Sequence, residues 1–156
     1  MEKATFAAGC FWGVEAAFRQ IKGVISTSVG YTGGTFPNPT YQDTCTGTTG
    51  HAEAIEIIYN AAVVSYAQLL NVFWQNHDPT TLNRQGPDIG TQYRSAIFFH
   101  SPEQEAAAIA SKKKLQHSVY SGKIIVTEIV AASQYYPAED YHQQYFEKLG
   151  LSTSKI

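Results

Sequence analysis

Residues 4 to 13 read Ala4-Thr5-Phe6-Ala7-Ala8-Gly9-Cys10-Phe11-Trp12-Gly13, an apolar run followed by a thiol between two glycines and beside two large aromatic rings. The run from Ala4 to Ala8 predicts a short buried strand, and after it apolar residues recur at helical spacing, at Phe11, Val14, Phe18 and Ile21. Cys10 is therefore expected where a strand gives way to a helix. Unpaired N–H groups and the positive dipole end of a helix start favour a thiolate, so the position predicts a reactive thiol. The alternative is that Cys10 is a small buried hydrophobic residue.

Beyond this stretch, the sequence pattern predicts further strands at 24–31, 51–59, 93–100 and 123–131, and further helices over 66–78, 102–117 and 138–149. Ser65 is expected to cap the second helix, and Ser101-Pro102 to open the third. The order is βαββαβ followed by αβα. We therefore predict an α+β fold with a ferredoxin-like βαββαβ core, a two-layer sandwich with helices on one face of an antiparallel sheet, and a C-terminal αβα extension.

The 156 residues suit a single domain spanning 1–156, which can bury one substantial core. Two polar segments interrupt the regular elements, at 32–50 and 80–92. Long segments of this kind inside a compact domain are often functional.

Composition excludes several classes of function. The formal net charge is −2 and no basic block is present, which argues against nucleic acid or an anionic membrane as a partner. No cationic leader and no apolar run long enough to span a bilayer is seen, so a cytoplasmic location is expected. The two cysteines, Cys10 and Cys45, have no zinc-site spacing; we expect reduced thiols and no metal.

Glu53 is the unusual carboxylate of the chain. In an alternating strand over 51–59 it shares a face with Ile55 and Ile57, where desolvation raises a carboxyl pKa. Glu53 is therefore a candidate neutral acid. The alternative is that Glu53 lies at an exposed strand start and stays ionised.

The polar segments contribute further candidates, Tyr41, Cys45, Asp88 and Tyr93. A tyrosine can donate a hydrogen bond at neutral pH while uncharged, so Tyr41 and Tyr93 can hold an oxygen acceptor, or else serve only in packing. His142 is expected to be a packing residue.

The chain closely resembles the A-type peptide methionine sulfoxide reductases. Six blocks carry the resemblance, in order and at matching spacing: Gly9–Gly13, Gly30–Gly34, Tyr41–Glu53, His77–Pro79, Arg84–Ser95 and Glu139–Gln143. Their combination makes chance agreement very unlikely, whereas the first block alone would only be suggestive.

The resemblance implies an oxidoreductase that repairs oxidised proteins under oxidative stress. The thiolate of Cys10 would attack the sulfur of a methionine sulfoxide, Glu53 would protonate the oxygen, and Tyr41 and Tyr93 would bind it. Phe11 and Trp12 match rings that hold the methyl group, and Asp88 is associated with the same polar site. The family acts on the S epimer at sulfur, protein-bound or free, and needs no metal or organic cofactor. Methionine is released and Cys10 becomes a sulfenic acid.

This chain differs from the family pattern in the residues expected for the recycling step. Many members carry cysteines in a glycine-rich tail, and no such cysteine follows Leu149 here. Cys45 matches a family cysteine that is not usually given the resolving role. We expect an external thiol, thioredoxin or glutathione with glutaredoxin, to reduce the sulfenic acid, with Cys45 as a possible internal resolver.

Two other classes stay open from the residues alone. A cysteine hydrolase would pair Cys10 with a histidine and would turn over esters or amides without a reductant. A non-catalytic module that binds oxidised methionine would keep its function in Cys10→Ser.

Overall fold

The computed structural model describes residues 1–118, 120 and 122–150. In chain order the elements are β1 (Glu2–Ala8), α1 (Phe11–Arg19), β2 (Val24–Thr32), α2 (Tyr41–Cys45), β3 (Ala52–Tyr59), α3 (Tyr66–Gln75), β4 (Arg84–Gln85), β5 (Asp88–Ile89), a 3₁₀ turn (Thr91–Tyr93), β6 (Ser95–Phe99), α4 (Pro102–His117), β7 (Glu128–Ala131), β8 (Tyr135–Pro137), a second 3₁₀ turn (Asp140–His142) and α5 (Tyr145–Lys148).

The described residues form a mixed sheet in the order β7-β6-β1-β3-β2-β8, with β4 and β5 as a separate hairpin. β1 runs antiparallel to β3 and β6, and β2 runs antiparallel to β3 and β8. The fold is α+β, as predicted. The four strands β6, β1, β3 and β2 are antiparallel throughout, as expected for the core sheet, whereas β7 of the C-terminal extension pairs with β6 in parallel after the crossover through α4.

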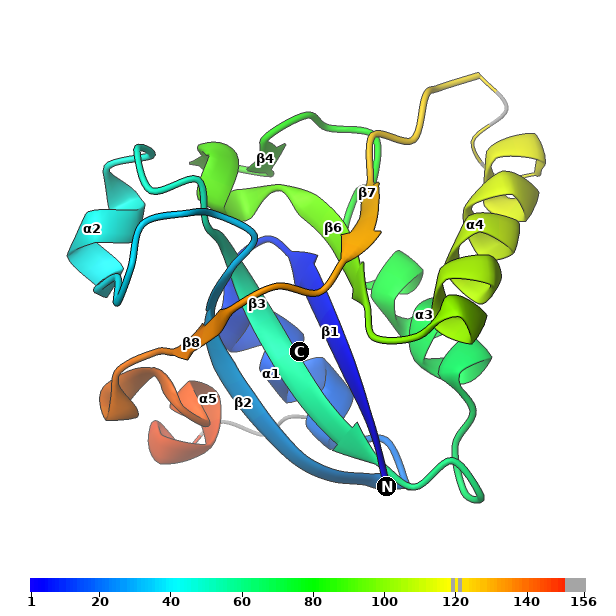
Figure 1. The fold of residues 1–156 in the computed structure, drawn as a ribbon, viewed down its shortest axis with the longest axis horizontal. Helices are drawn as coiled ribbons and strands as arrows, with labels where there is room; N and C mark the ends of the chain where they lie inside the picture. Colours follow the sequence, from blue (N-terminus) through cyan, green and yellow to red (C-terminus); the bar gives the residue numbers. More distant parts are fainter. Residues whose placement is uncertain (119, 121, 151–156) are drawn as a thin grey trace.

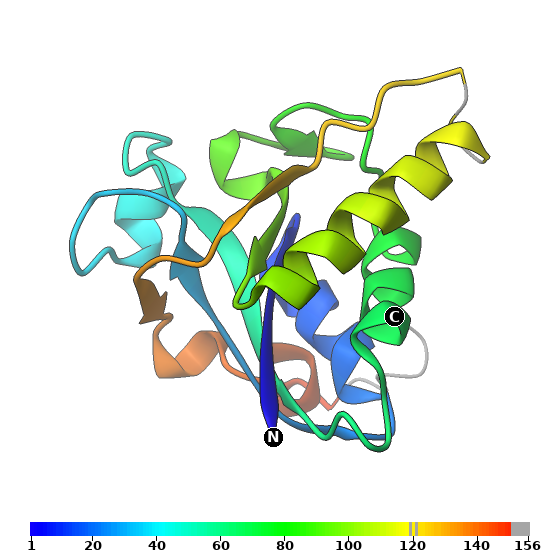
Figure 2. The same ribbon diagram turned by 45° about the vertical axis from the view of Figure 1, so that its right-hand side comes forward.

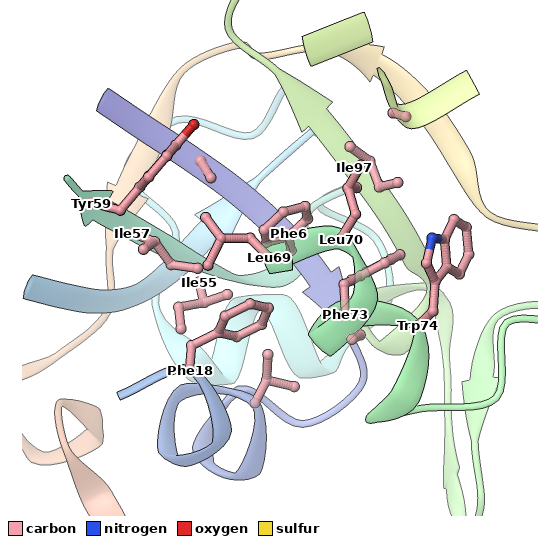
Figure 3. Packing of buried hydrophobic residues seen from close by; sticks show 14 of the residues in the cluster. Phe6, Phe18, Ile55, Ile57, Tyr59, Leu69, Leu70, Phe73, Trp74 and Ile97 are labelled. Atoms are coloured by element: carbon pink, nitrogen blue, oxygen red, sulfur yellow. The ribbon is translucent and has the colours of Figure 1, made fainter. Parts of the chain in front are cut away.

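Helices α1 and α3 cover one face of the central strands and enclose the main core (Figure 3). Phe6 of β1 lies at its centre, with ring centroids 5.4 Å from Phe18 and 5.1 Å from Phe73. The connection from β7 to β8 crosses the opposite face, in front of β1 and β3 in Figure 1, and the turned view agrees (Figure 2). It carries the chain from one edge of the sheet to the other, so that residues 138–148 return to the end of α1.

Local capping signals predict the helix starts well. The Ser65 side chain accepts from the Gln68 amide in a capping box, and Ser101 accepts from the Gln104 amide with Pro102 in the first turn. The two polar segments also contain regular elements that the prediction missed. The segment 32–50 contains α2, capped by Thr40 and Asp43, and the segment 80–92 contains the β4–β5 hairpin.

The C-terminal part differs most from the prediction. The strand expected over 123–131 is formed only from Glu128. After the unpredicted β8, the helix expected over 138–149 is replaced by a 3₁₀ turn and the short α5. Gln144 has a left-handed backbone, with φ of 49° and ψ of 47°, which no continuous right-handed helix allows. No helix in the described part of the chain is long and apolar enough to cross a membrane.

Candidate active site

Cys10 is the N-cap residue of α1 and is separated from the end of β1 only by Gly9. Because β1 and β3 are antiparallel, with Phe6 opposite Ile55, the start of β3 lies beside the end of β1. This brings Glu53 to the first turn of α1, where its Oε1 accepts a hydrogen bond of 3.2 Å from the Phe11 amide. The sheet register thus joins Phe11 and Glu53, which are 42 positions apart in the chain.

Glu53 is a buried acid, with 1 % of its surface exposed. Burial raises the pKa of its carboxyl to about 8, the Phe11 amide opposes this shift, and nearby Asp88 adds to it. Its other oxygen, Oε2, finds no hydrogen-bond partner among the described residues. Since the amide occupies a lone pair of Oε1, the proton belongs on Oε2, where it is free to be donated.

The expectation that the helix start makes Cys10 a resting thiolate is wrong. The amides of Trp12 and Gly13 do act on the sulfur in the expected direction, but burial is the larger effect. Together with the charges of Glu53 and Asp88, burial raises the pKa of the Cys10 thiol to about 11. At neutral pH the free site therefore holds a neutral thiol beside a neutral acid.

Tyr41, Tyr93 and Asp88 lie around this pair, half-buried, each brought by a different element. Burial raises the pKa of Tyr93 to about 12, and Glu53, Cys45 and Asp88 contribute to this shift. Burial also raises the pKa of Tyr41, next to the Cys45 thiol. Both hydroxyls stay protonated at neutral pH and can donate to an oxygen. Cys45 is exposed at the end of α2, on the same side of the site as Tyr41.

Gly9 allows the hairpin that carries Asp88 to approach Cys10. Its φ is 92°, and a Cβ there would lie 2.8 Å from the Gln85 side chain. Gln85 in turn accepts from the Asp78 amide at 2.9 Å and fixes the hairpin to the loop after α3.

The two aromatic residues after Cys10 differ in their surroundings. Phe11 is buried against Tyr31 and His142, with centroids 5.8 and 5.2 Å away. Trp12 is half-buried; its ring stacks on Tyr145 at 3.9 Å, and its Nε1 donates to His142 Nδ1 at 2.9 Å. His142 is buried, as a packing role requires, and it also orients Trp12.

No described histidine is hydrogen-bonded to Cys10, so the arrangement lacks the dyad of a cysteine hydrolase.

Sequence reasoning assigned no role to Glu139. Its Oε1 accepts from the Tyr31 hydroxyl at 2.9 Å and its Oε2 from the Tyr41 amide at 3.0 Å. Burial opposes ionisation of Glu139, but these hydrogen bonds outweigh it and lower the pKa. Glu139 thus ties α2 to β2. The block Glu139–Gln143 already indicated that Glu139 is important. The helix predicted there gave no reason to expect its contacts with Tyr31 and Tyr41.

Among the described residues, no group of three His, Cys, Asp or Glu side chains is arranged to hold a metal ion. The chemistry available to the site comes from a thiol, a neutral carboxylic acid and two phenolic hydroxyls.

A family model described as peptide methionine sulfoxide reductase matches residues 2–155. The chain belongs to this family. The curated "Peptide methionine sulfoxide reductase MsrA" of Methanosarcina acetivorans is 64 % identical over 151 residues, which cover 97 % of this chain and 80 % of that protein.

Solved structures of the family share the fold. Reduced Mxr1 from Saccharomyces cerevisiae matches with a TM-score of 0.89 and 37 % identity, covering 94 % of this chain and 84 % of that one. Mxr1 in complex with Trx2 matches with a TM-score of 0.65 and 27 % identity over 92 % of this chain and 84 % of that one. A methionine sulfoxide reductase is an oxidoreductase, so these findings favour the redox reading over a hydrolase or a binding module.

Proposed function

We propose that the protein reduces the S epimer of methionine sulfoxide, in proteins or as the free amino acid, with Cys10 as nucleophile and Glu53 as acid. The observation that carries the proposal is the buried Glu53 carboxyl, whose pKa is raised to about 8 and whose Oε2 has no partner among the described residues, near enough to the Cys10 thiol at the helix start to raise the pKa of that thiol. A sulfoxide has a partly positive sulfur and a partly negative oxygen. It fits between a sulfur nucleophile and an oxygen-directed proton donor.

The reaction balances without a cofactor. The Cys10 sulfur forms a bond to the sulfoxide sulfur while Glu53 donates its proton to the oxygen, and the thiol proton restores the acid. The protonated oxygen then passes to the Cys10 sulfur and the bond to the substrate sulfur breaks. Methionine leaves, and Cys10 is a sulfenic acid. Tyr41 and Tyr93 would hold the oxygen, Asp88 would help keep Glu53 protonated, and Phe11 and Trp12 would hold the methyl group.

Cys10→Ser tests the nucleophile. In an anaerobic assay with a methionine sulfoxide peptide and dithiothreitol, the wild type should consume only the S epimer, and Cys10→Ser should be inactive because an alcohol is a far weaker nucleophile than a thiol. Cys45→Ser is the matched control. Turnover by Cys10→Ser would contradict the proposal, and so would equal consumption of both epimers.

For the second half of the cycle we propose an external thiol, with thioredoxin as the first candidate and glutathione with glutaredoxin as the second. The structure of Mxr1 with Trx2 supports thioredoxin by analogy within the family. Two thiols of the reductant would become a disulfide, and the sulfenic oxygen would leave as water.

Cys45 is the competing internal resolver, because it shares the neighbour Tyr93 with Cys10. The intact mass after excess sulfoxide without reductant distinguishes the two routes. We expect a stable added oxygen, whereas a loss of two hydrogens that Cys45→Ser abolishes would show an internal disulfide.

The proposal also covers the fold type, the domain extent and the cellular location. We assign the elements β1-α1-β2-β3-α3-β6, with sheet order β6-β1-β3-β2, to a ferredoxin-like core followed by the extension from α4 onward. We take residues 1–156 as one domain, and we place the protein in the cytoplasm, where cell fractionation can test it.

A further inference from the structure

A buried carboxylate outside the reactive pair is found on α1. Glu15 is 1 % exposed, three residues after Trp12 and therefore close to it on one side of the helix. Its Oε2 accepts from the Thr27 hydroxyl at 2.7 Å and from the Gln144 side-chain amide at 2.9 Å, and its Oε1 accepts from the Gln144 backbone amide at 2.8 Å. A buried carboxylate is costly unless such donors meet it, so these three contacts belong together.

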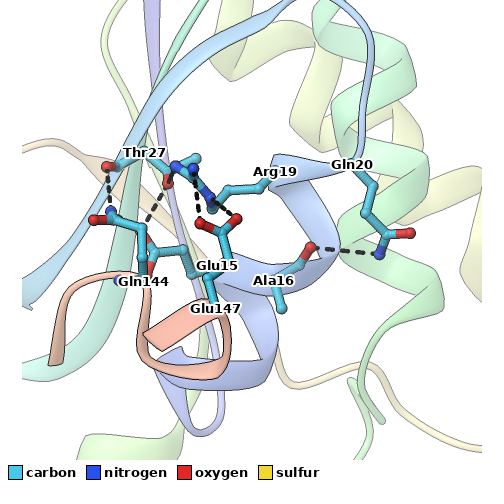
Figure 4. A network of polar contacts seen from close by, with 7 residues as sticks. All are labelled: Glu15, Ala16, Arg19, Gln20, Thr27, Gln144 and Glu147. Carbon is cyan, nitrogen blue, oxygen red and sulfur yellow. Dashed lines mark hydrogen bonds and ion pairs between the residues drawn. The ribbon is translucent and has the colours of Figure 1, made fainter. Parts of the chain in front are cut away.

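These contacts join α1 to β2 and to the C-terminal segment (Figure 4). The outer end of the same network is exposed, where Arg19 donates to the Thr27 hydroxyl at 3.2 Å and pairs with Glu147 at 2.7 Å. An exposed ion pair contributes little to stability. The buried end at Glu15 is therefore the part that holds the segment.

Gln144 is the residue that Glu15 holds, and its conformation has a cost. A left-handed backbone at a residue other than glycine costs about 1 kcal/mol or more, so it persists only where contacts impose it. This turn reverses the chain between His142 and Tyr145. As a result, His142 accepts a hydrogen bond from the edge of the Trp12 indole, and Tyr145 stacks on its face.

We propose that Glu15 is a positioning residue for substrate binding, which fixes the Trp12 ring through Gln144. The proposal rests on the methyl-binding role of Trp12 proposed above. Glu15 touches neither Cys10 nor Glu53 by a hydrogen bond, so its loss should weaken binding of the sulfoxide more than the chemical step.

The sequence offers a direct reporter of this effect, because Trp12 and Trp74 are its two tryptophans. Trp74→Phe leaves Trp12 as the sole indole, and in this background Glu15→Gln places an amide N–H among the donors of Thr27 and Gln144. We expect a shifted Trp12 emission maximum, easier quenching by acrylamide, a KM for methionine sulfoxide raised about tenfold and a kcat changed less than about twofold. Glu147→Gln is the matched control and should change none of these, because it alters the exposed end of the network.

Each result decides the matter. Unchanged Trp12 emission and KM in a folded Glu15→Gln would overturn the proposal. A tenfold fall of kcat without a change in KM would overturn it as well. A shifted emission with an unchanged KM would support the bracing of Trp12 but refute its methyl-binding role. If Glu15→Gln does not fold, Gln144→Gly replaces it. Glycine keeps the backbone donor and tolerates the left-handed turn but removes the side-chain amide, so the same changes at smaller size are expected.

Discussion

At the residue scale, the central feature is the balance of protons between Cys10 and Glu53. Both pKa values are raised by burial, the thiol to about 11 and the carboxyl to about 8. The resting thiol is thereby kept neutral, and the acid is kept ready to donate. A substrate that accepts the proton of Glu53 also removes the obstacle to ionising Cys10, since the thiol proton can return to the carboxylate. In the proposed mechanism, nucleophile and acid are thus activated together, when the sulfoxide is bound.

Keeping Glu53 neutral has a consequence for stability. Its pKa in the folded protein, about 8, lies above the ordinary value of 4.5, so folding favours the protonated form. This contribution is fully present below pH 4.5 and is lost as the pH rises through 8. Glu53→Gln removes the titration. Relative to the wild type, the variant should gain unfolding free energy on the order of 4 kcal/mol between pH 5 and pH 9. Urea denaturation of both proteins at the two pH values measures this, and a constant difference would contradict the assigned pKa.

At the scale of elements, the site depends on how closely β8 lies along β2. Gly30 faces Pro137 in this pairing, and a Cβ at Gly30 would meet the Tyr136 carbonyl oxygen and lie 2.6 Å from the Tyr135 ring. No side chain larger than hydrogen fits there without displacing β8. Because β8 leads directly to Glu139 and His142, the glycine also determines where the C-terminal wall of the site lies.

Gly30→Ala should therefore destabilise the protein by about 2 kcal/mol and raise KM, because β8 must move to relieve the contact. Gly122→Ala is a suitable control, since a Cβ at Gly122 has open space around it. Thermal unfolding and steady-state kinetics of the two variants test this. Wild-type stability and KM in Gly30→Ala would mean that β8 does not constrain the site.

At the scale of the whole molecule, the site joins residues from both ends of the chain, and this decides what a sequence can predict. The alternation that singled out Glu53 and the caps at Ser65 and Ser101 are local signals, and all three agree with the structure. The pKa of Cys10 was not predictable in this way, because the sequence indicates a helix start but not the burial that outweighs it. The helix predicted over 138–149 failed for the same reason. The turn at Gln144 is held by hydrogen bonds to Glu15 and Thr27, which lie far away in the chain.

The central claim, that Glu53 acts as a proton donor and not merely as a neighbour of the thiol, is tested most directly by comparing two rates in Glu53→Gln. One is single-turnover reduction of methionine sulfoxide, and the other is alkylation of Cys10 by iodoacetamide in a Cys45→Ser background. Loss of the acid should slow reduction by about 10²- to 10⁴-fold. The charged Glu53 carboxylate raises the pKa of the Cys10 thiol. Its removal should therefore leave alkylation at high pH unchanged or make it faster. Parallel slowing of both rates would show that Glu53 serves only the nucleophile, and unchanged reduction would show that it is not the acid.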